Sequence, residues 1–247
     1  EAIKSNFPDY CETIYCKSSG TLPNTGTDYF LFGNKVEAVA KENNILFSVN
    51  WVEGQKTGFF LDQRENRKLL GEFSKGKKVL NTFCYTGGFS IYAMSAGAEL
   101  VTSVDISQKA VDLAASNMEL NFPNANHKAV ADDVFNFMKE HTQQYDVIVL
   151  DPPAFAKSIK SKHTATQAYK RLNIAGLKAL APNGILFTFS CSQVIDDVLF
   201  YNTVAAAAIE TGRNIRVLHK LEQGPDHPTN IYHPEGHYLK GLVLFVE

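Results

Sequence analysis

The stretch "KKVLNTFCYTGGFSIYAMSAG", Lys77 to Gly97, decides the fold of this chain. It opens with an apolar run of strand length and continues from Gly87 with the periodicity of a helix, which Gly97 closes. Between the two, Gly87 and Gly88 allow a tight turn and let a ligand approach the backbone at the helix amino terminus. This strand, turn and helix predict one unit of an α/β fold, with a ligand site at the turn.

The same alternation continues through the rest of the chain. We expect strands at "LVTSVDIS", "HKAVADD", "YDVIVLD" and "GILFTFSCS", and helices at "SQKAVDLAASNMELN", capped by Ser107, "VFNFMKEH", "AYKRLNIAGLKALAPNG" and "DDVLFYNTVAAAAIETG". Two further strands, "RNIRVLHKL" and "YLKGLVLFVE", flank a polar segment without a helix and should pair antiparallel. The pattern predicts a Rossmann-like α/β fold, with helices on both faces of a mostly parallel seven-stranded sheet whose last strand is antiparallel.

The first part of the chain has a different pattern. Aromatic and β-branched residues alternate with polar ones in "ETIYCKSSG", "DYFLFGN" and "ILFSVNWVEG". We therefore predict a small β-hairpin-rich unit over residues 1–57 and the α/β domain over 58–247. Because the chain begins at Glu1 without an initiator Met, we also expect sequence upstream.

The composition narrows the class of protein. A chain of 247 residues with 45% hydrophobic content can bury one sizeable core, and its longest apolar runs are too short for a membrane helix. The formal charge of −2 argues against a surface that coats polyanions, although "PPAFAKSIKSKHTATQAYKR" has five basic residues and no acidic one. The four cysteines form no CxxC pair, which favours a reducing cytoplasm and disfavours zinc.

The ends of the first three α/β strands indicate an adenosine site. The glycine turn lacks the GxGxxG pattern, which disfavours a nicotinamide dinucleotide. Asp105 ends the second strand, where an acid can accept both ribose hydroxyls, or alternatively cap the next helix. Asp132 and Asp133 end the third strand. There an acid can bind an adenine amino group, or alternatively it can begin the next helix. Together these three strand ends predict a binding site for an adenosine that carries no phosphates, as in enzymes that use S-adenosylmethionine.

The ends of the fourth and fifth strands indicate chemistry on a base. In "LDPPAF", Pro152 and Pro153 make a rigid turn that can aim the Asp151 carboxylate and a prolyl carbonyl at a planar, amide-like base. The alternative is a capped loop. In "GILFTFSCSQV", Cys191 ends a strand between two serines, where it is either a nucleophile or a small buried hydrophobe.

These motifs resemble a known family. The segments "KTGFFLDQRENR", "VLNTFCYTGGFS", "VDISQKAVDLAASNMELN", "YDVIVLDPPAF", "LFTFSCS" and "DHPTNIYHPEGHYLKG" occur in an order and spacing similar to the bacterial ribosomal RNA large-subunit methyltransferase I family, over roughly residues 45 to 247. Members are class I enzymes that methylate carbon-5 of a cytosine in 23S ribosomal RNA with S-adenosylmethionine. They begin with a PUA domain and a hairpin-bearing central domain, and residues 1–57 resemble only the latter part of the central domain.

The resemblance implies roles for particular residues. It implies a covalent adduct of the base with Cys191, and Asp151 contacting both the cofactor and the target base. Ribosomal RNA is the implied partner and no membrane is expected, with a homodimer as one candidate assembly. The implied cofactor residues are Gln63, Arg64, Arg67, Tyr85, Thr86, Gly87, Gly88, Asp105, Asp133 and Asp151. From the chemistry of the residues around the Asp151 turn and in the later polar segment, we expect the substrate to contact Pro152, Pro153, Phe155, Lys157, Lys170 and His227.

Several alternatives stay open at this point. The basic residues of the "LDQRENR" segment also suit a helix surface, and His227 suits a loop brace as well as a target pocket. Cys84 is expected to be structural, and the base that removes the carbon-5 proton is unassigned. Two alternative functions also stay open. One is an amino-group or guanine methyltransferase, which would not use the cysteine, and the other is an RNA-binding module without catalytic activity.

Overall fold

The computed structural model describes residues 1–19, 26–156 and 158–247. They form two compact units, Glu1–Phe60 and Leu61–Glu247. The division falls at residue 60, against 57 in the sequence-based prediction. Each unit is considered by itself below.

The first unit consists of a short helix and two small antiparallel sheets. Its elements are α1 (Ala2–Asn6), β1 (Ile14–Cys16) paired with β2 (Tyr29–Phe32), and β3 (Glu37–Glu42) paired with β4 (Ile45–Asn50). Asn43 and Asn44 join β3 to β4 with φ values of 48° and 68°, the left-handed conformation that two-residue hairpin turns require. Hairpins therefore form here, as the alternating pattern predicts.

The second unit contains a mixed sheet, and its described residues supply seven strands in the order β10-β11-β9-β8-β5-β6-β7. Neighbouring strands from β5 to β9 are parallel, whereas β11 is antiparallel to both β9 and β10. The predicted sheet is thus confirmed, including its antiparallel last strand. The strands are β5 (Lys78–Thr82), β6 (Leu100–Asp105), β7 (His127–Ala131), β8 (Tyr145–Leu150), β9 (Leu180–Ser190), β10 (Ile215–Leu221) and β11 (Lys240–Val246).

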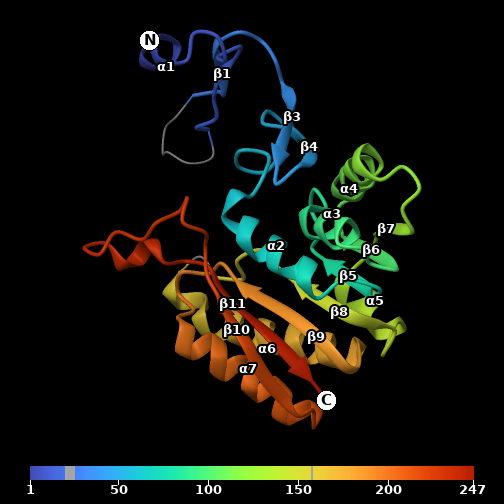
Figure 1. Cartoon of the computed structure of the whole chain (residues 1–247). Helices are drawn as coiled ribbons and strands as arrows, with labels where there is room; N and C mark the ends of the chain where they lie inside the picture. Colours follow the sequence, from blue (N-terminus) through green and yellow to red (C-terminus); the bar gives the residue numbers. More distant parts are fainter. Residues whose placement is uncertain (20–25, 157) are drawn as a thin grey trace. The chain divides into compact units, whose positions relative to one another are not determined.

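Helices cover both faces of this sheet (Figure 1). Helices α2, α3 and α4 pack on one face, and α5, α6 and α7 pack together on the other. In the part of the chain that the structure describes, no helix is both long and apolar enough to cross a bilayer. The helices are α2 (Arg64–Glu72), α3 (Gly88–Ser95), α4 (Gln108–Asn121), α5 (Val134–Glu140), α6 (Lys162–Ala179) and α7 (Asp197–Thr211), with short 3-10 turns η1 (Leu61–Gln63), η2 (Ile159–Ser161) and η3 (Pro234–Gly236).

Local sequence signals explain most of the helix ends. Ser107 caps α4 by accepting a hydrogen bond from the Ala110 amide at 3.3 Å, as predicted. One boundary differs from the prediction, because the residues around Pro182 join β9 instead of ending α6. Proline lacks the amide hydrogen that a helix needs, and the pairing of β8 with β9 is irregular at this point, where a proline is tolerated.

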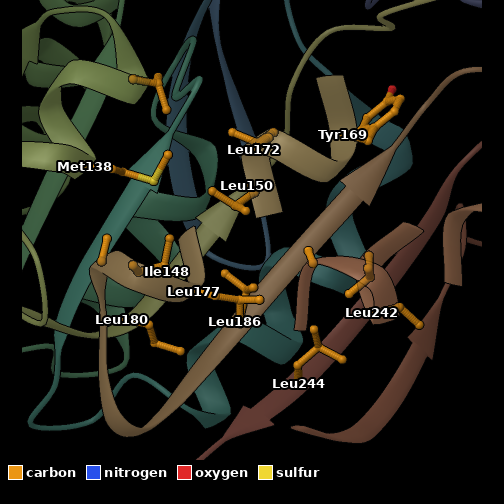
Figure 2. Packing of buried hydrophobic residues seen from close by; sticks show 14 of the residues in the cluster. Met138, Ile148, Leu150, Tyr169, Leu172, Leu177, Leu180, Leu186, Leu242 and Leu244 are labelled. Atoms are coloured by element: carbon orange, nitrogen blue, oxygen red, sulfur yellow. The ribbon is translucent and has the colours of Figure 1, made fainter. Parts of the chain in front are cut away.

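The core lies on both faces of the central strands. Ile148, Leu150 and Leu186 point to the side of α5, α6 and α7, where Figure 2 shows them among other buried side chains. The next residues along β9 point the other way: Phe187 and Phe189 meet the rings of Phe73 and Phe89. This alternation packs both faces of β8 and β9 and so fixes the positions of the residues that follow these strands.

Leu186→Ala should lower the free energy of unfolding by about 2–5 kcal/mol, because Leu186 is completely buried and the substitution removes buried methyl groups and leaves a cavity. Denaturation followed by far-ultraviolet circular dichroism measures this, since the single tryptophan, Trp51, lies in the other unit. Ile209→Ala, at a position 83% exposed, is the control and should change stability by less than about 0.5 kcal/mol. Equal losses in both variants would contradict this view of the core.

Candidate functional site

The candidate site lies where β5 and β8 end side by side. The chain runs from β5 to β6 and β7 on one side of the sheet, and then returns to place β8 and β9 on the other side. A reversal of this kind opens a crevice at the carboxyl ends of the strands, where ligands bind in α/β sheets. The glycine turn follows β5 here. The turn that begins with Asp151, Pro152 and Pro153, called the Asp151 turn below, follows β8.

The glycine turn, residues 83–87, has an unusual backbone. Phe83 and Tyr85 have φ values of 54° and 44°, which side-chain-bearing residues seldom adopt, and Gly87 has a φ of 79°. The Tyr85 amide donates to Asp105 at 3.1 Å, and the Thr86 carbonyl accepts from the side chain of Asn117 at 3.0 Å. Neighbouring strands and helices thus hold the turn in a strained shape, which is a common property of ligand-binding turns.

Gly87 of the turn and Gly88, which begins α3, also lie in tight packing. A Cβ atom on Gly87 would lie 3.0 Å from the Cβ of Ala114 in α4. A Cβ atom on Gly88 would lie 3.0 Å from the Cδ of Arg67 in α2. The sequence suggested close approach to a ligand, and the structure adds close approach to two helices.

The two acids assigned to adenosine also stabilise local structure. Asp105 accepts hydrogen bonds from the amides of Tyr85 and Ser107. Asp133 caps α5 through the amides of Phe135 and Asn136, both at 3.0 Å. The capping alternative is therefore realised for Asp133 but not for Asp105, because Ser107 caps α4. Each carboxylate oxygen has two lone pairs, so the cofactor roles of both acids remain predictions.

The α2 segment brings two of its three predicted residues toward Asp151. Gln63 donates to the Asp151 carboxylate at 3.1 Å and accepts from Asn66 at 2.7 Å. Arg67 is 3% exposed and lies close enough for its positive charge to affect Asp151. Arg64 behaves differently, because its guanidinium contacts Glu65 at 3.0 Å and Asp226 at 3.5 Å instead.

The carboxyl of Asp151 has unusual electrostatics. Burial raises its pKa to about 7, and the neighbouring charge of Asp62 acts in the same direction. The hydrogen bond from Gln63 and the charge of Arg67 oppose the rise but do not cancel it. Asp151 therefore exchanges a proton near neutral pH, a property that is common among acid–base groups of enzymes.

Asp62 and Tyr238 form a pair that the sequence did not reveal. The Tyr238 hydroxyl donates to one Asp62 oxygen at 2.6 Å, and burial, reinforced by Asp62, raises the tyrosine pKa. The other Asp62 oxygen is buried and has no hydrogen-bond partner among the residues that the structure describes. The only sequence signal was their membership in the segments "LDQRENR" and "YLKG", which lie far apart in the chain.

Cys191 lies directly after β9, against the Asp151 turn. Its Sγ atom lies 3.9 Å from the Pro152 carbonyl oxygen, and the side chain is half-buried. The Ser192 hydroxyl donates to the Ala156 carbonyl at 2.7 Å, so this serine ties the two turns together. By contrast, Cys84 is buried and its pKa is raised by burial, which agrees with a structural role.

The predicted substrate residues that follow Asp151 differ in how far they are buried. Pro152 is buried and Pro153 is exposed. The centroid of the Phe155 ring lies 4.7 Å from that of the Tyr169 ring in α6. Lys157 lies outside the described residues. The Asp151 turn therefore combines a prolyl carbonyl beside Cys191 with an aromatic side chain nearby.

Two other predicted substrate residues contact the protein itself. Lys170 forms an ion pair with Glu210 in α7 at 2.7 Å, so its ammonium is engaged within the fold. The backbone of His227 donates to the Gly224 carbonyl at 2.9 Å, and its imidazole lies 3.5 Å from Asp226. Loop bracing, one of the two roles considered for His227, is thus present. Substrate contacts of both residues remain predictions.

Comparisons with known proteins agree with this arrangement. Residues 22–243 match the family model for S-adenosylmethionine-dependent methyltransferases. The chain is 42% identical to "Ribosomal RNA large subunit methyltransferase I" of Aeromonas hydrophila, over 92% of this chain and 58% of that protein. It is 44% identical to the protein of the same name from Vibrio parahaemolyticus, over 100% of this chain and 64% of that protein. The chain thus spans less than two thirds of either relative.

A solved structure gives the same result for the fold. It is described as a methyltransferase, SMU.776, complexed with SAH, and it is 27% identical to this chain with a TM-score of 0.83. The similarity covers 99% of this chain and 64% of that one.

Asp151→Asn should stabilise the protein increasingly as pH rises. A raised pKa means that the folded state holds the proton more tightly, so the wild type loses stability between about pH 4 and the folded pKa of about 7. The stability difference between variant and wild type should therefore grow by about 1–3 kcal/mol from pH 5 to pH 8, measured by denaturation at each pH. Asp112→Asn, on the exposed side of α4, is the control. A difference that shrinks with pH would contradict the assignment.

Proposed function

Because the chain belongs to the S-adenosylmethionine-dependent methyltransferases, we propose that it methylates carbon-5 of a cytosine in 23S ribosomal RNA through a covalent adduct with Cys191. The observation that carries the proposal is the contact of the Cys191 thiol with the Pro152 carbonyl, next to a carboxyl that exchanges its proton near neutral pH. Nitrogen methylation would need no thiol at this place. The names of the two bacterial relatives support ribosomal RNA as the substrate.

The cofactor would occupy the crevice between the glycine turn and the Asp151 turn. Asp105 would bind the ribose, and Asp133 would bind the adenine amino group with its free lone pairs. Arg67 and Gln63 would bind the methionine end, since a guanidinium is a good partner for a carboxylate. Arg64, which contacts Glu65 and Asp226, is the weaker candidate. The bound cofactor supplies an electrophilic methyl group on a sulfonium.

The target cytosine would lie between Cys191 and Asp151. Its carbon-5 is a poor nucleophile until the Cys191 thiolate adds to carbon-6. This addition shifts the carbon-5 to carbon-6 double bond to carbon-4 and carbon-5 and moves an electron pair onto ring nitrogen 3. Protonated Asp151 can donate its proton to ring nitrogen 3 as this charge develops, and the Pro152 carbonyl can accept from the exocyclic amine. Carbon-5 would then be an enamine carbon, able to accept the methyl group as the bond from that group to the sulfonium sulfur breaks and neutral S-adenosylhomocysteine is left.

The product forms when the adduct collapses. A base removes the carbon-5 proton, the electrons of that bond restore the double bond, and the thiolate of Cys191 leaves carbon-6. Nitrogen 3 then returns its proton to Asp151. A homodimer and a cytoplasmic location stay predictions, and neither enters these steps.

Cys191→Ala should lower carbon-5 methylation of ribosomal RNA by more than about 10³-fold, because the nucleophile is lost. The dissociation constant for S-adenosylmethionine should change by less than about threefold, because Cys191 faces the base and not the cofactor. Mass-spectrometric mapping of methylated nucleosides and calorimetry measure the two quantities in the full-length protein.

Cys16→Ala, in β1, is the matched control and should keep both the rate and the affinity. A normal rate of methylation by the Cys191→Ala protein would favour an amino-group or guanine methyltransferase. Failure of the wild type to bind S-adenosylmethionine would favour a non-catalytic RNA-binding module.

A further inference from the structure

Lys240 is a buried cation directly behind the candidate nucleophile. It begins β11 opposite Ser190, the last residue of β9, and only 3% of its surface is exposed. Its ammonium donates to the carbonyl of Ser192 at 2.8 Å and to the carbonyl of Tyr238 at 2.7 Å. The side chain thus joins the backbone after β9, next to Cys191, to the segment that precedes β11.

Burial at this position costs free energy when the side chain is a charged lysine. Burying an ammonium costs several kcal/mol when no anion pairs with it. Among the residues described, no carboxylate lies within ion-pair distance of Lys240. Asp196 and Asp197 at the start of α7 affect it through space, but both are exposed and contact Lys162 and His237, respectively. Its hydrogen-bond acceptors among the described residues are two neutral carbonyls, which do not balance its charge.

Among the described residues, Lys240 supplies a positive charge that acts on Cys191, whereas the other ionisable groups near the thiol do not. Tyr169 and Tyr238 are neutral there, because burial raises both pKa values, that of Tyr169 to about 12. Asp151, next to Pro152, brings no positive charge. Burial lowers the pKa of Lys240, and a negative charge on Cys191 would raise it. Because the coupling of two titrating groups is reciprocal, the ammonium favours the thiolate by the same free energy.

We propose that the Lys240 ammonium stabilises the thiolate of Cys191 and so activates the nucleophile. Lys240 is a positioning residue in this role, because it acts through Cys191 and through the two backbone segments that it joins. A free thiol has a pKa of about 8.5 and is only slightly ionised at neutral pH, so a methyltransferase of this type needs such an activator. The inference rests on the proposed function, because it gives Cys191 a reason to be ionised.

The pH profile of Cys191 alkylation tests this inference without RNA. Iodoacetamide reacts with the thiolate, and peptide mass spectrometry gives the rate at Cys191 separately from the three other cysteines. Lys240→Gln removes the charge and keeps amide donors for the two carbonyls. The substitution should move the midpoint of the pH profile of Cys191 alkylation upward by about one pH unit or more, which lowers the alkylation rate at pH 7 about tenfold. The limiting rate at high pH should not change.

Two further variants complete the design. Lys240→Arg keeps the charge and should keep the midpoint within about 0.5 pH unit. Lys162→Gln removes an exposed lysine that pairs with Asp196 and should leave the profile unchanged. Calorimetry with S-adenosylmethionine shows whether each variant is folded.

The outcomes separate this inference from the proposed function. If the midpoint in Lys240→Gln is that of the wild type, or if the rate falls equally at all pH values, Lys240 holds the backbone only and the inference is wrong. If the midpoint moves as expected but Cys191→Ala protein still methylates cytosine, the thiolate exists and the proposed adduct is wrong instead.

Discussion

The hydrogen bond from the Ser192 hydroxyl to the Ala156 carbonyl, at 2.7 Å, holds together the two turns on which the proposed chemistry depends. One turn follows β8 and presents Asp151 and the Pro152 carbonyl, and the other follows β9 and presents Cys191. Parallel pairing of β8 with β9 brings the two turns to the same edge of the sheet. The hydrogen bond then fixes their separation, so that the thiol lies 3.9 Å from the prolyl carbonyl. A planar base would meet a nucleophile and hydrogen-bonding groups in one place.

The charges around these turns are arranged for proton exchange at the expense of stability. Asp62 and Asp151 are close enough to repel each other, and burial disfavours the charge on Asp151 further. Lys240 is buried beside the turn that carries Cys191, with no carboxylate in contact among the described residues. Packing on both faces of β8 and β9 supplies the stability that keeps such groups buried. Burying ionisable groups around one site is a general way to tune their pKa values for catalysis.

The sequence predicted the sheet because strand-length apolar runs alternate with helical periodicity along the second unit. It also predicted that Asp105, Asp133, Asp151 and Cys191 lie at one edge of the sheet, because each stands at or just after the end of a strand and the carboxyl ends of parallel strands meet there. It did not reveal the contact of Tyr238 with Asp62 or the position of Lys240, because these depend on tertiary packing between distant segments. The strained φ values of Phe83 and Tyr85 had no signal either, since aromatic residues rarely mark such turns.

The central claim is that Cys191 bonds to carbon-6 of the target cytosine while the methyl group reaches carbon-5. The most direct measurement uses ribosomal RNA that contains 5-fluorocytosine, because fluorine does not leave as a proton and the methylated adduct cannot collapse. Incubated with the full-length protein and S-adenosylmethionine, this RNA should remain covalently attached, and peptide mass spectrometry should locate the nucleotide, with its added methyl group, on Cys191. Methylated fluorocytosine that is released without any attachment to the protein would contradict the account.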